Sequence, residues 1–454
     1  MSCLLVATRV LMPLALAALA ACSGETLDPR PDVILISIDT LRPDHLGAYG
    51  YAKPTSPTLD AIAAQGVVFE DVTSPSPWTL PAHASLLTGL YPSRHRANSH
   101  YRSLGKSAPT LASILSEHGY DAAAVVNSHY LSRRYGLDRG FRRFRHVQEW
   151  VFEVMPTTEV TDQAVEWLSA PRRRPLFLFL HYYDVHSDYR SLPDFESAFL
   201  DDYDGHADGT TRQLAEVRKG NVSFDEDDVA HLLDLYDAGI LQIDHELGRL
   251  LTLLRARGLL DRSLLVITSD HGEEFLEHGG VLHGRTQFQE VLRVPLLMRG
   301  PGLPAGTRVS TPVSLVDIAP TILAMLEIPV PASLDGVDLA PLWRGETRDF
   351  AERHLFGDAD HHNEVDDITR SVRQGRYALH YNRLTEQHQL YDLEQDPWER
   401  VDIAAEQQEI ADRLRERLLR FMADAEQAAL AEDRPLDPLT PEELQHLREL
   451  GYLQ

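Results

Sequence analysis

Acidic and histidine side chains follow two apolar runs of the sequence, at positions where they could share a metal ion. Asp39 comes directly after "DVILISI" (32–38), and Asp270 and His271 follow "SLLVITS" (263–269). Carboxylate oxygens with one imidazole suit Ca²⁺, Mg²⁺, Mn²⁺ or Zn²⁺. An aspartate after a strand can instead cap the next helix or turn. Because both aspartates follow apolar strands, we expect them to hold one divalent metal ion together with His271.

Further imidazoles lie beyond the predicted strands. "HYYDVHSDY" (181–189) contributes His181, Asp184 and His186, and "EHGGVLHGRTQFQE" (277–290) contributes His278, His283 and Arg285. Imidazoles and a guanidinium beside a metal form an electropositive pocket that suits a tetrahedral oxyanion. Most of the 21 histidines must nevertheless be ordinary loop or surface residues.

A hydroxyl group could serve as the nucleophile at the start of a short helix. The stretch "SPSPWTLPAHASLLTG" (74–89) predicts a turn and then a helix that begins near Thr79 and ends at Gly89. A threonine hydroxyl is a poor nucleophile at neutral pH and needs a metal or a base. A helix N-terminus also favours negative charge. We therefore interpret Thr79 as a metal-activated nucleophile and a ligand of the ion; the alternative is that Thr79 only caps the helix.

Continuous apolar runs predict the strands that must position these groups. Runs of this kind are typical of strands buried on both faces of a parallel sheet, and they occur at 32–38, 121–126, 175–180, 263–268 and 294–298. Helical patterns at 57–66, 109–119 and 227–258 lie between them. The alternation predicts an α/β fold with a doubly wound, mostly parallel sheet flanked by helices. Sites in such folds lie beyond the carboxyl ends of the strands.

The chain divides into a large and a small part. We expect the sheet and its helices to span 32–330 and a smaller C-terminal α+β subdomain with a helical tail to span 331–454. Strand-like "RSVRQGRYALHY" (370–381) and a helix at 404–431 belong to the smaller part, as does a tail that begins with a capping pattern, Thr440 with Glu443 three residues on. Segment 187–226 is acidic and poorly periodic, which predicts an irregular excursion.

The first segment indicates export. Residues 1–22 combine Arg9, a short apolar run and the ending "LAAC", which resembles the lipobox of bacterial lipoproteins with Cys22 as the lipidated residue. The alternative is an ordinary secretory signal. We expect a tether at 23–31 and a membrane-anchored lipoprotein of a bacterial cell envelope, in the periplasm or on the outer membrane. Cys3 and Cys22 are the only cysteines, so the mature chain beyond Cys22 has no thiol nucleophile.

The charge balance limits the partners. A net charge of -26 argues against a nucleic-acid partner, because phosphate backbones are bound by basic surfaces.

Taken in order, the motifs resemble those of the sulfatase family within the alkaline-phosphatase superfamily, from about residue 32 to about residue 399. The landmarks are "DVILISIDTLRPDHLGAYGY", "TLPAHASLLTG", "FLFLHYYDVH", "YDAGILQIDHELGRLL", "SDHGEEFLEHG", "HGRTQFQEVLRVPLLMRGPG", "LVDIAPTIL" and "YDLEQDPWE". The resemblance implies metal ligands at Asp39, Asp270 and His271. It also implies ester-contacting histidines at His186 and His283, and a basic group at Arg285.

Four positions depart from the family pattern. Thr40 stands where the family commonly has a second aspartate, His83 replaces an arginine, and Asn127 replaces a lysine, although His129 falls where the family has a histidine. The fourth is Thr79, at the position where sulfatases carry a cysteine or serine that becomes formylglycine. Threonine cannot yield that aldehyde. Threonine has a single hydroxyl, so water or another acceptor must attack the central atom of the covalent intermediate to release it. Phosphoryl-transfer members of the superfamily use this route.

The resulting hypothesis is a metal-dependent hydrolase or transferase of phosphate or sulfate esters. The substrate would be a sulfated or phosphorylated glycan, lipid or small molecule, with His83 beside the nucleophile and His129 or His186 protonating the leaving group. One alternative is a catalytically inactive sulfatase-fold protein that binds an anionic glycan or lipid head group. Another is a sulfatase that works without the aldehyde. A second metal at Asp227 and His231 is also conceivable from their spacing, but a solvated helix face explains that pair better.

Overall fold

The computed structural model describes residues 28–147, 156–359, 369–431 and 436–449. The expected signal segment and the first part of the tether lie outside these residues. Among the residues described, no helix combines the length and the hydrophobicity that crossing a bilayer requires.

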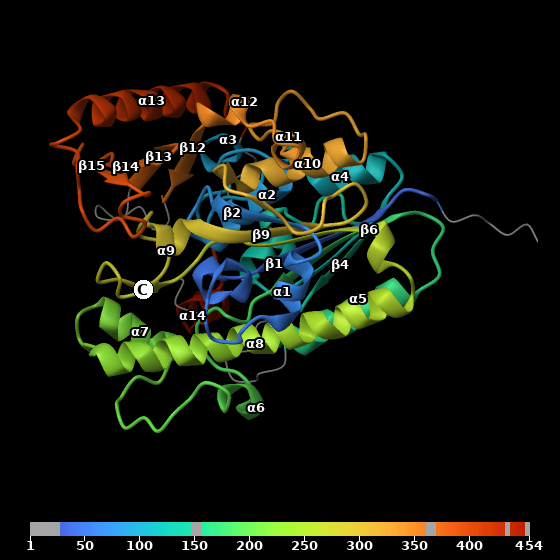
Figure 1. The fold of residues 1–454 in the computed structure, drawn as a ribbon, viewed down its shortest axis with the longest axis horizontal. Coiled ribbons are helices and arrows are strands. Elements are labelled where there is room, and N and C mark those ends of the chain that lie inside the picture. Colours follow the sequence, from blue (N-terminus) through green and yellow to red (C-terminus); the bar gives the residue numbers. More distant parts are fainter. Residues whose placement is uncertain (1–27, 148–155, 360–368, 432–435, 450–454) are drawn as a thin grey trace, which may run out of the picture.

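A nine-stranded sheet forms the centre of the molecule (Figure 1). Its order is β10-β2-β9-β6-β1-β5-β3-β4, with β11 also paired to β2, and only β9 runs against its neighbours. The strands are β1 (Asp32–Ile38), β2 (Val67–Thr73), β3 (Asp121–Val126), β4 (Arg143–His146), β5 (Leu176–Tyr182), β6 (Ser263–Ser269), β9 (Arg293–Arg299), β10 (Thr307–Val309) and β11 (Val313–Ser314). The five predicted apolar runs are β1, β3, β5, β6 and β9. The prediction of a mostly parallel sheet is confirmed.

Helices cover both faces of this sheet. One face packs against α2 (Thr79–Thr88), α4 (Leu111–Glu117) and α10 (Ile318–Met325). The other packs against α1 (Pro57–Ala63), α5 (Pro156–Ser169) and the long α8 (Glu226–Ala256). Alternate strand residues enter the two cores, since side chains alternate along a strand. Val33, Leu35, Phe177 and Phe179 face the α2 layer, whereas Ile34, Ile36, Leu178 and Leu180 face the α8 layer.

Local sequence signals explain where the main helices begin and end. Asp225 starts α8 with a capping box to Asp228, and Thr110 starts α4 with one to Ser113. Gly89 ends α2 in the left-handed conformation (φ 68°), which costs glycine little.

The C-terminal part forms an antiparallel sheet covered by one long helix. The sheet order is β12 (His354–Asp358), β13 (Thr369–Gln374), β14 (Tyr377–Asn382), β15 (His388–Asp392), and α13 (Gln408–Gln427) packs on it. The run 370–381 is therefore two strands joined by a turn at Gly375. The tail helix α14 (Pro441–Glu449) begins as predicted, because the Glu443 carboxylate accepts the Thr440 N–H and the Thr440 hydroxyl accepts the Glu443 N–H.

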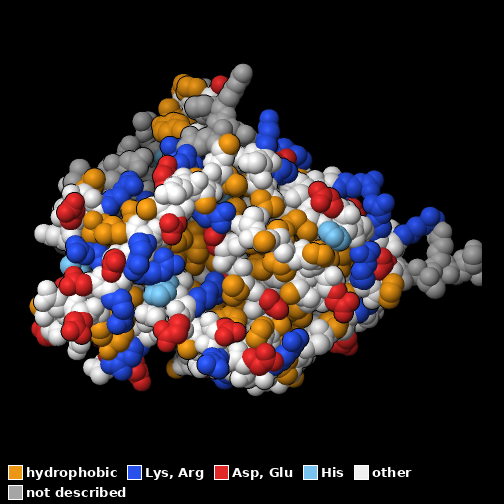
Figure 2. All heavy atoms as spheres, turned by 90° about the horizontal axis from the view of Figure 1, so that it is seen from above, with side chains coloured by type: hydrophobic (Ala, Val, Ile, Leu, Met, Phe, Trp, Pro, Cys, Tyr) orange, Lys and Arg blue, Asp and Glu red, His pale blue; other side chains and the backbone are white. Residues whose placement is uncertain are grey.

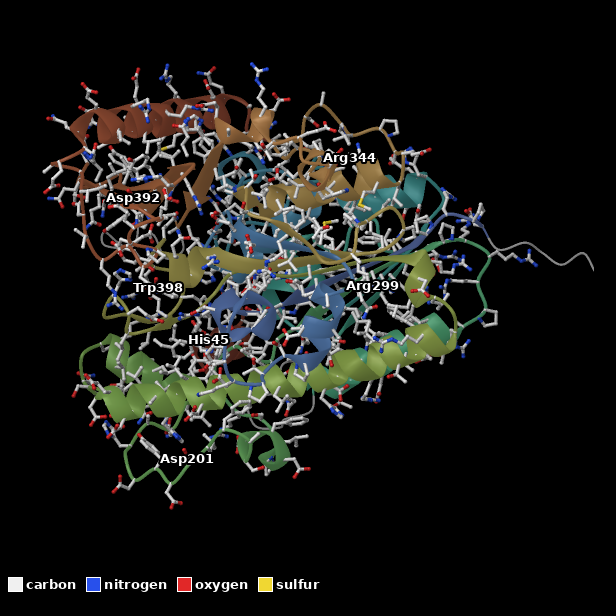
Figure 3. All side chains as sticks on the ribbon, in the orientation of Figure 1. His45, Asp201, Arg299, Arg344, Asp392 and Trp398 are labelled. Carbon is white, nitrogen blue, oxygen red and sulfur yellow. The ribbon has the colours of Figure 1, made fainter. Side chains whose placement is uncertain are left out.

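Short elements complete the chain. The segment 187–226, predicted to be irregular, contains two short helices, α6 (Pro193–Glu196) and α7 (Thr211–Arg218). α6 lies on the outer side of α8, as does Asp201, which is labelled in Figure 3, whereas α7 contacts the short strand Val281–Leu282, where Arg218 donates to the Val281 carbonyl oxygen. The remaining elements are α3 (Pro92–His95), α9 (Gln289–Leu292), α11 (Ala340–Trp343), α12 (Arg348–Ala351), β7 (Glu274–Phe275), β8 (Val281–Leu282) and the 3₁₀ turns η1 (Pro43–His45), η2 (Gly47–Tyr49), η3 (His129–Leu131), η4 (Arg133–Tyr135), η5 (Leu260–Arg262) and η6 (Leu315–Asp317).

The surface in Figure 2 carries acidic and basic side chains interspersed with one another. The net charge of -26 is therefore not gathered into a single-sign patch on that face.

Candidate active site

The carboxyl ends of four parallel strands bring the candidate residues together. Asp39 follows β1, Asn127 follows β3, His181 lies near the end of β5, and Asp270 follows β6. The register pairs Ser37 with His181, so these strand ends are level with one another.

Two carboxylates and one imidazole form the centre of the site. Asp39, Asp270 and His271 each offer a ligand atom, and these atoms lie within 4.8 Å of one another. Nε2 of His271 is 3.2 Å from Oδ2 of Asp270 and 3.6 Å from Oδ1 of Asp39. All three side chains are fully buried, and neither carboxylate oxygen of Asp270 has a hydrogen-bond partner among the described residues.

The orientation of His271 fits a cation between these groups. Nδ1 of His271 donates to the carbonyl oxygen of Gly272 at 3.0 Å, so in the neutral ring Nε2 carries a lone pair. That lone pair faces two carboxylates, an arrangement that requires either a proton or a metal ion between them. Metal-bound histidines characteristically donate their other N–H to a carbonyl in this way. The donor set therefore fits a divalent cation.

The pKa shifts of this pair agree with its need for positive charge. Burial disfavours the charged forms of both groups, yet the attraction between them raises the pKa of the His271 imidazole and lowers the pKa of Asp270 well below its ordinary range.

Thr79 lies at the edge of this cluster. Its Oγ1 is 3.5 Å from Nε2 of His271, and the side chain is fully buried. Thr79 is the first residue of α2, and the N-cap position is occupied by Trp78. The alternative that Thr79 serves as the N-cap is therefore wrong. Thr79 instead lies in the first turn of α2, the end of a helix that favours negative charge.

His83 lies one turn further along α2 and is held by both ring nitrogens. Nδ1 donates to the carbonyl oxygen of Thr79 at 2.9 Å, and Nε2 accepts from the Ser37 hydroxyl at 2.9 Å. Burial lowers the pKa of His83, although Asp270 lies 3.4 Å from Nδ1. His83 is therefore a neutral side chain that supports the Thr79 backbone.

His186 and His283 stand on the other side of His271. The His283 ring centroid is 4.3 Å from that of His271 and 4.9 Å from that of His186. Nδ1 of His283 donates to Oε1 of Glu273 at 2.9 Å, and Nδ1 of His186 donates to the carbonyl oxygen of Ser187 at 2.6 Å. Burial lowers the pKa of His186 to about 4 and that of His283 well below its ordinary value, so both are neutral at pH 7.

The other predicted residues have different surroundings. Arg285 is half-buried in the loop after β8, two residues beyond His283. His129 is half-buried in η3, where it contacts Tyr130 and lies 3.4 Å from the Tyr135 hydroxyl. The pair considered for a second metal lies at the start of α8, where Asp227 is exposed and the His231 ring stacks on Tyr203 at 3.8 Å.

Two site residues were missed by the sequence reasoning. Ser37 holds His83, and Glu273 holds His283. His181, one of the imidazoles expected beyond the third predicted strand, brings Nε2 to 3.3 Å from Oδ2 of Asp39. It follows the alternation of Phe177 and Phe179 along β5, two side chains that face the α2 layer.

Comparisons with known proteins agree with the fold. Residues 31–328 match the family model "Sulfatase", and residues 277–424 match "N-sulphoglucosamine sulphohydrolase, C-terminal". A Δ4,5-hexuronate-2-O-sulfatase of Bacteroides thetaiotaomicron is 25% identical over 435 residues, covering 87% of this chain and 88% of the relative. Arylsulfatase K of Bos taurus is 26% identical over 447 residues, covering 86% and 81%.

A solved structure shows the same architecture. The phosphonate monoester hydrolase of Agrobacterium radiobacter superposes with a TM-score of 0.72 at 24% identity, covering 87% of this chain and 96% of the other. The "Sulfatase" model covers well over half of the chain. On this evidence the chain belongs to the sulfatase family, in the alkaline-phosphatase superfamily.

Proposed function

We propose that the protein is a metal-dependent hydrolase, or transferase, of phosphate or sulfate esters with Thr79 as its nucleophile. Asp39, Asp270 and His271 hold one divalent cation, with the Thr79 hydroxyl as a further ligand. The observation that carries the proposal is the buried Oγ1 of Thr79, 3.5 Å from His271 Nε2, an atom that is itself 3.2 Å from Asp270 and 3.6 Å from Asp39. When bound, the cation supplies the positive charge that lowers the pKa of a neighbouring hydroxyl and offsets the charge of the ester.

The side chain at position 79 favours phosphate over sulfate. A formylglycine hydrate has two hydroxyls, so one can attack the ester and the other can later expel the sulfate. Thr79 has one, so the covalent intermediate must be broken by attack on the central atom, which is the route of phosphoryl-transfer enzymes. The similarity to a phosphonate monoester hydrolase as well as to sulfatases supports this range of esters.

Imidazoles near Thr79 can accept and donate the protons that such a two-step displacement moves. In the first step Oγ1 bonds to phosphorus or sulfur, the ester oxygen leaves, and the Thr79 proton passes through an imidazole to that leaving oxygen. In the second step water attacks the same atom, loses its proton to an imidazole, and releases Oγ1, which regains a proton. The Nδ1 atoms of His186 and His283 donate to other groups, so in the neutral rings Nε2 carries the lone pair that can accept these protons.

The substrate class follows from these groups and from the relatives. A tetrahedral anionic ester fits beside Arg285 and the imidazoles. The Bacteroides relative is named for a sulfated hexuronate, which supports a glycan ester among the candidates.

The test compares threonine variants at the two ends of one helix. The full-length protein, solubilised in detergent and treated with chelator, is assayed on aryl phosphate, phosphodiester, phosphonate and sulfate esters with Mn²⁺, Zn²⁺ or Ca²⁺. Thr79→Ala should lower kcat by about 10³-fold or more. Thr88→Ala should keep its activity, because the Thr88 hydroxyl donates to the Ala84 carbonyl oxygen and accepts from the Leu90 N–H at the other end of the helix.

Two outcomes would contradict the proposal. Sulfate turnover that survives Thr79→Ala would show that another group is the nucleophile. Metal binding without turnover of any of these esters would favour the inactive, anion-binding alternative.

A further inference from the structure

We propose that His181 is a positioning residue for Asp39, which it hydrogen-bonds through one carboxylate oxygen while Asn127 orients its ring. The inference rests on the proposed function, because it assumes that Asp39 holds the cation. It assigns a role to a histidine that the Asp39–Asp270–His271 cluster does not include.

The position of His181 is set by the sheet. It pairs with Ser37 in the β1–β5 ladder. Ser37 lies on the neighbouring strand β1, two residues before Asp39. Its Nε2 is 3.3 Å from Oδ2 of Asp39, and its Nδ1 is 3.2 Å from Oδ1 of Asn127. The His83 ring stands edge-on to it, with centroids 4.8 Å apart, and the His181 side chain is fully buried.

One of the two orientations of the Asn127 amide places a proton on His181 Nε2, toward the Asp39 carboxylate 3.3 Å away. If the Asn127 oxygen faces Nδ1 of His181, Nδ1 must carry the ring proton. The lone pair of the neutral ring is then at Nε2, where it faces the Asp39 carboxylate. Nε2 of His181 and Nδ2 of Asn127 then have no hydrogen-bond partner. The oxygen and nitrogen of an amide side chain are nearly alike in shape, so the amide can turn over in place. Asn127 then donates to Nδ1, His181 donates from Nε2–H to Asp39, and both atoms gain partners.

This chain of hydrogen bonds acts on the geometry of the metal ligand. Oδ1 of Asp39 faces His271 at 3.6 Å, whereas Oδ2 faces His181. Holding Oδ2 leaves Oδ1 directed at the cluster, as groups behind a metal ligand commonly do. Asn127 and His83 occupy positions where the family pattern has lysine and arginine, so neutral hydrogen bonding replaces charge on this side of the site.

The test measures metal affinity instead of turnover. Mn²⁺ and Zn²⁺ dissociation constants are determined by competition with a chelating indicator on the full-length protein. His181→Ala should weaken binding about 10- to 100-fold, and His181→Gln, which keeps an N–H donor, should recover part of that loss. Asn127→Leu should also weaken binding, and it tests the same chain if His181→Ala does not fold. The control is His95→Gln, a buried histidine that pairs with Ser85 away from the cluster, and its affinity should not change.

Pulsed EPR of the Mn²⁺ protein then distinguishes positioning from ligation. One coordinated histidine nitrogen in the wild type, retained in His181→Ala, supports the inference. Two nitrogens that fall to one in the variant would make His181 a ligand and overturn it, as would equal affinities of wild type and His181→Ala. A wild-type protein that binds neither ion refutes the proposed function itself, so the two failures are distinguishable.

Discussion

Replacing Glu274 by glutamine is expected to stabilise the protein at high pH relative to the wild type. Glu274 lies in β7 with only 2% of its surface exposed, and its Oε1 accepts a hydrogen bond from the Thr286 hydroxyl at 2.6 Å. Burial, together with the charges of Glu290 and Glu277, raises the pKa of Glu274 from 4.5 to about 8. The folded protein therefore keeps this carboxyl protonated at pH 7.

The sign and size of the effect follow from proton binding. Between pH 4.5 and pH 8 the folded state binds a proton at Glu274 that the unfolded state has lost, so the free energy of unfolding falls as the pH rises. Each pKa unit corresponds to about 1.36 kcal/mol, so the loss amounts to about 5 kcal/mol once the pH exceeds both values. Within the range from pH 6 to pH 9 the loss is about 3 kcal/mol. Glutamine cannot ionise and still offers an oxygen to Thr286.

Urea unfolding, followed by circular dichroism at pH 6, 7.5 and 9 in the presence of chelator, measures this difference. The free energy of unfolding of Glu274→Gln, relative to wild type, should rise by about 3 kcal/mol across that range. Glu117→Gln, at an exposed glutamate of α4, should show no such trend. A difference between Glu274→Gln and wild type that is independent of pH would refute the reasoning that burial keeps Glu274 protonated.

Three further outcomes are expected. Ser37→Ala removes the donor to Nε2 of buried His83 and should lower the free energy of unfolding by about 1–2 kcal/mol in urea titrations, whereas an unchanged value would mean that this hydrogen bond is replaced. Arg353→Met removes the two hydrogen bonds of 2.6 Å that Arg353 donates to buried Asp317, and should lower the free energy of unfolding by about 3 kcal/mol in the same assay. A decrease below about 1 kcal/mol would argue against a stabilising role of this ion pair. Cys22→Ser should move the protein from the membrane fraction to the soluble fraction of fractionated cells, and continued sedimentation with membranes would contradict lipidation at that residue.

The apolar runs predicted the core of the sheet because strands buried on both faces leave no polar positions. β2 was missed for the opposite reason, since Glu70 and Asp71 interrupt its apolar pattern. Both are half-buried and paired with distant arginines, Glu70 with Arg308 and Asp71 with Arg373. The reversed direction of β9 could not be read either, because an apolar run looks alike whichever way the strand runs.

The grouping of Asp39, Asp270 and His271 was predictable because these residues lie directly at strand ends, which parallel pairing brings together. Residues that support the cluster were harder to find. Glu273 reaches His283 only because β7 and β8 fold back as a hairpin, a contact that spacing along the chain does not reveal. His129 lies near His100 and the Tyr130 and Tyr135 rings, in surroundings that its place in the family pattern did not indicate.

The departures from the family pattern change the charge of the site: His83 and Asn127 replace two cations, whereas Thr40 replaces one carboxylate, so the net change is a loss of positive charge. Two of the positions that would carry cations hold His83 and Asn127, and burial keeps His83 neutral. Two buried carboxylates, Asp39 and Asp270, remain opposite them. Because burying carboxylates without compensating charge is costly, the loss of neighbouring cations increases the demand for a divalent ion at the cluster. The proposed threonine nucleophile would need that same ion for activation, so the neutral neighbours and the proposed metal-activated hydroxyl are mutually consistent.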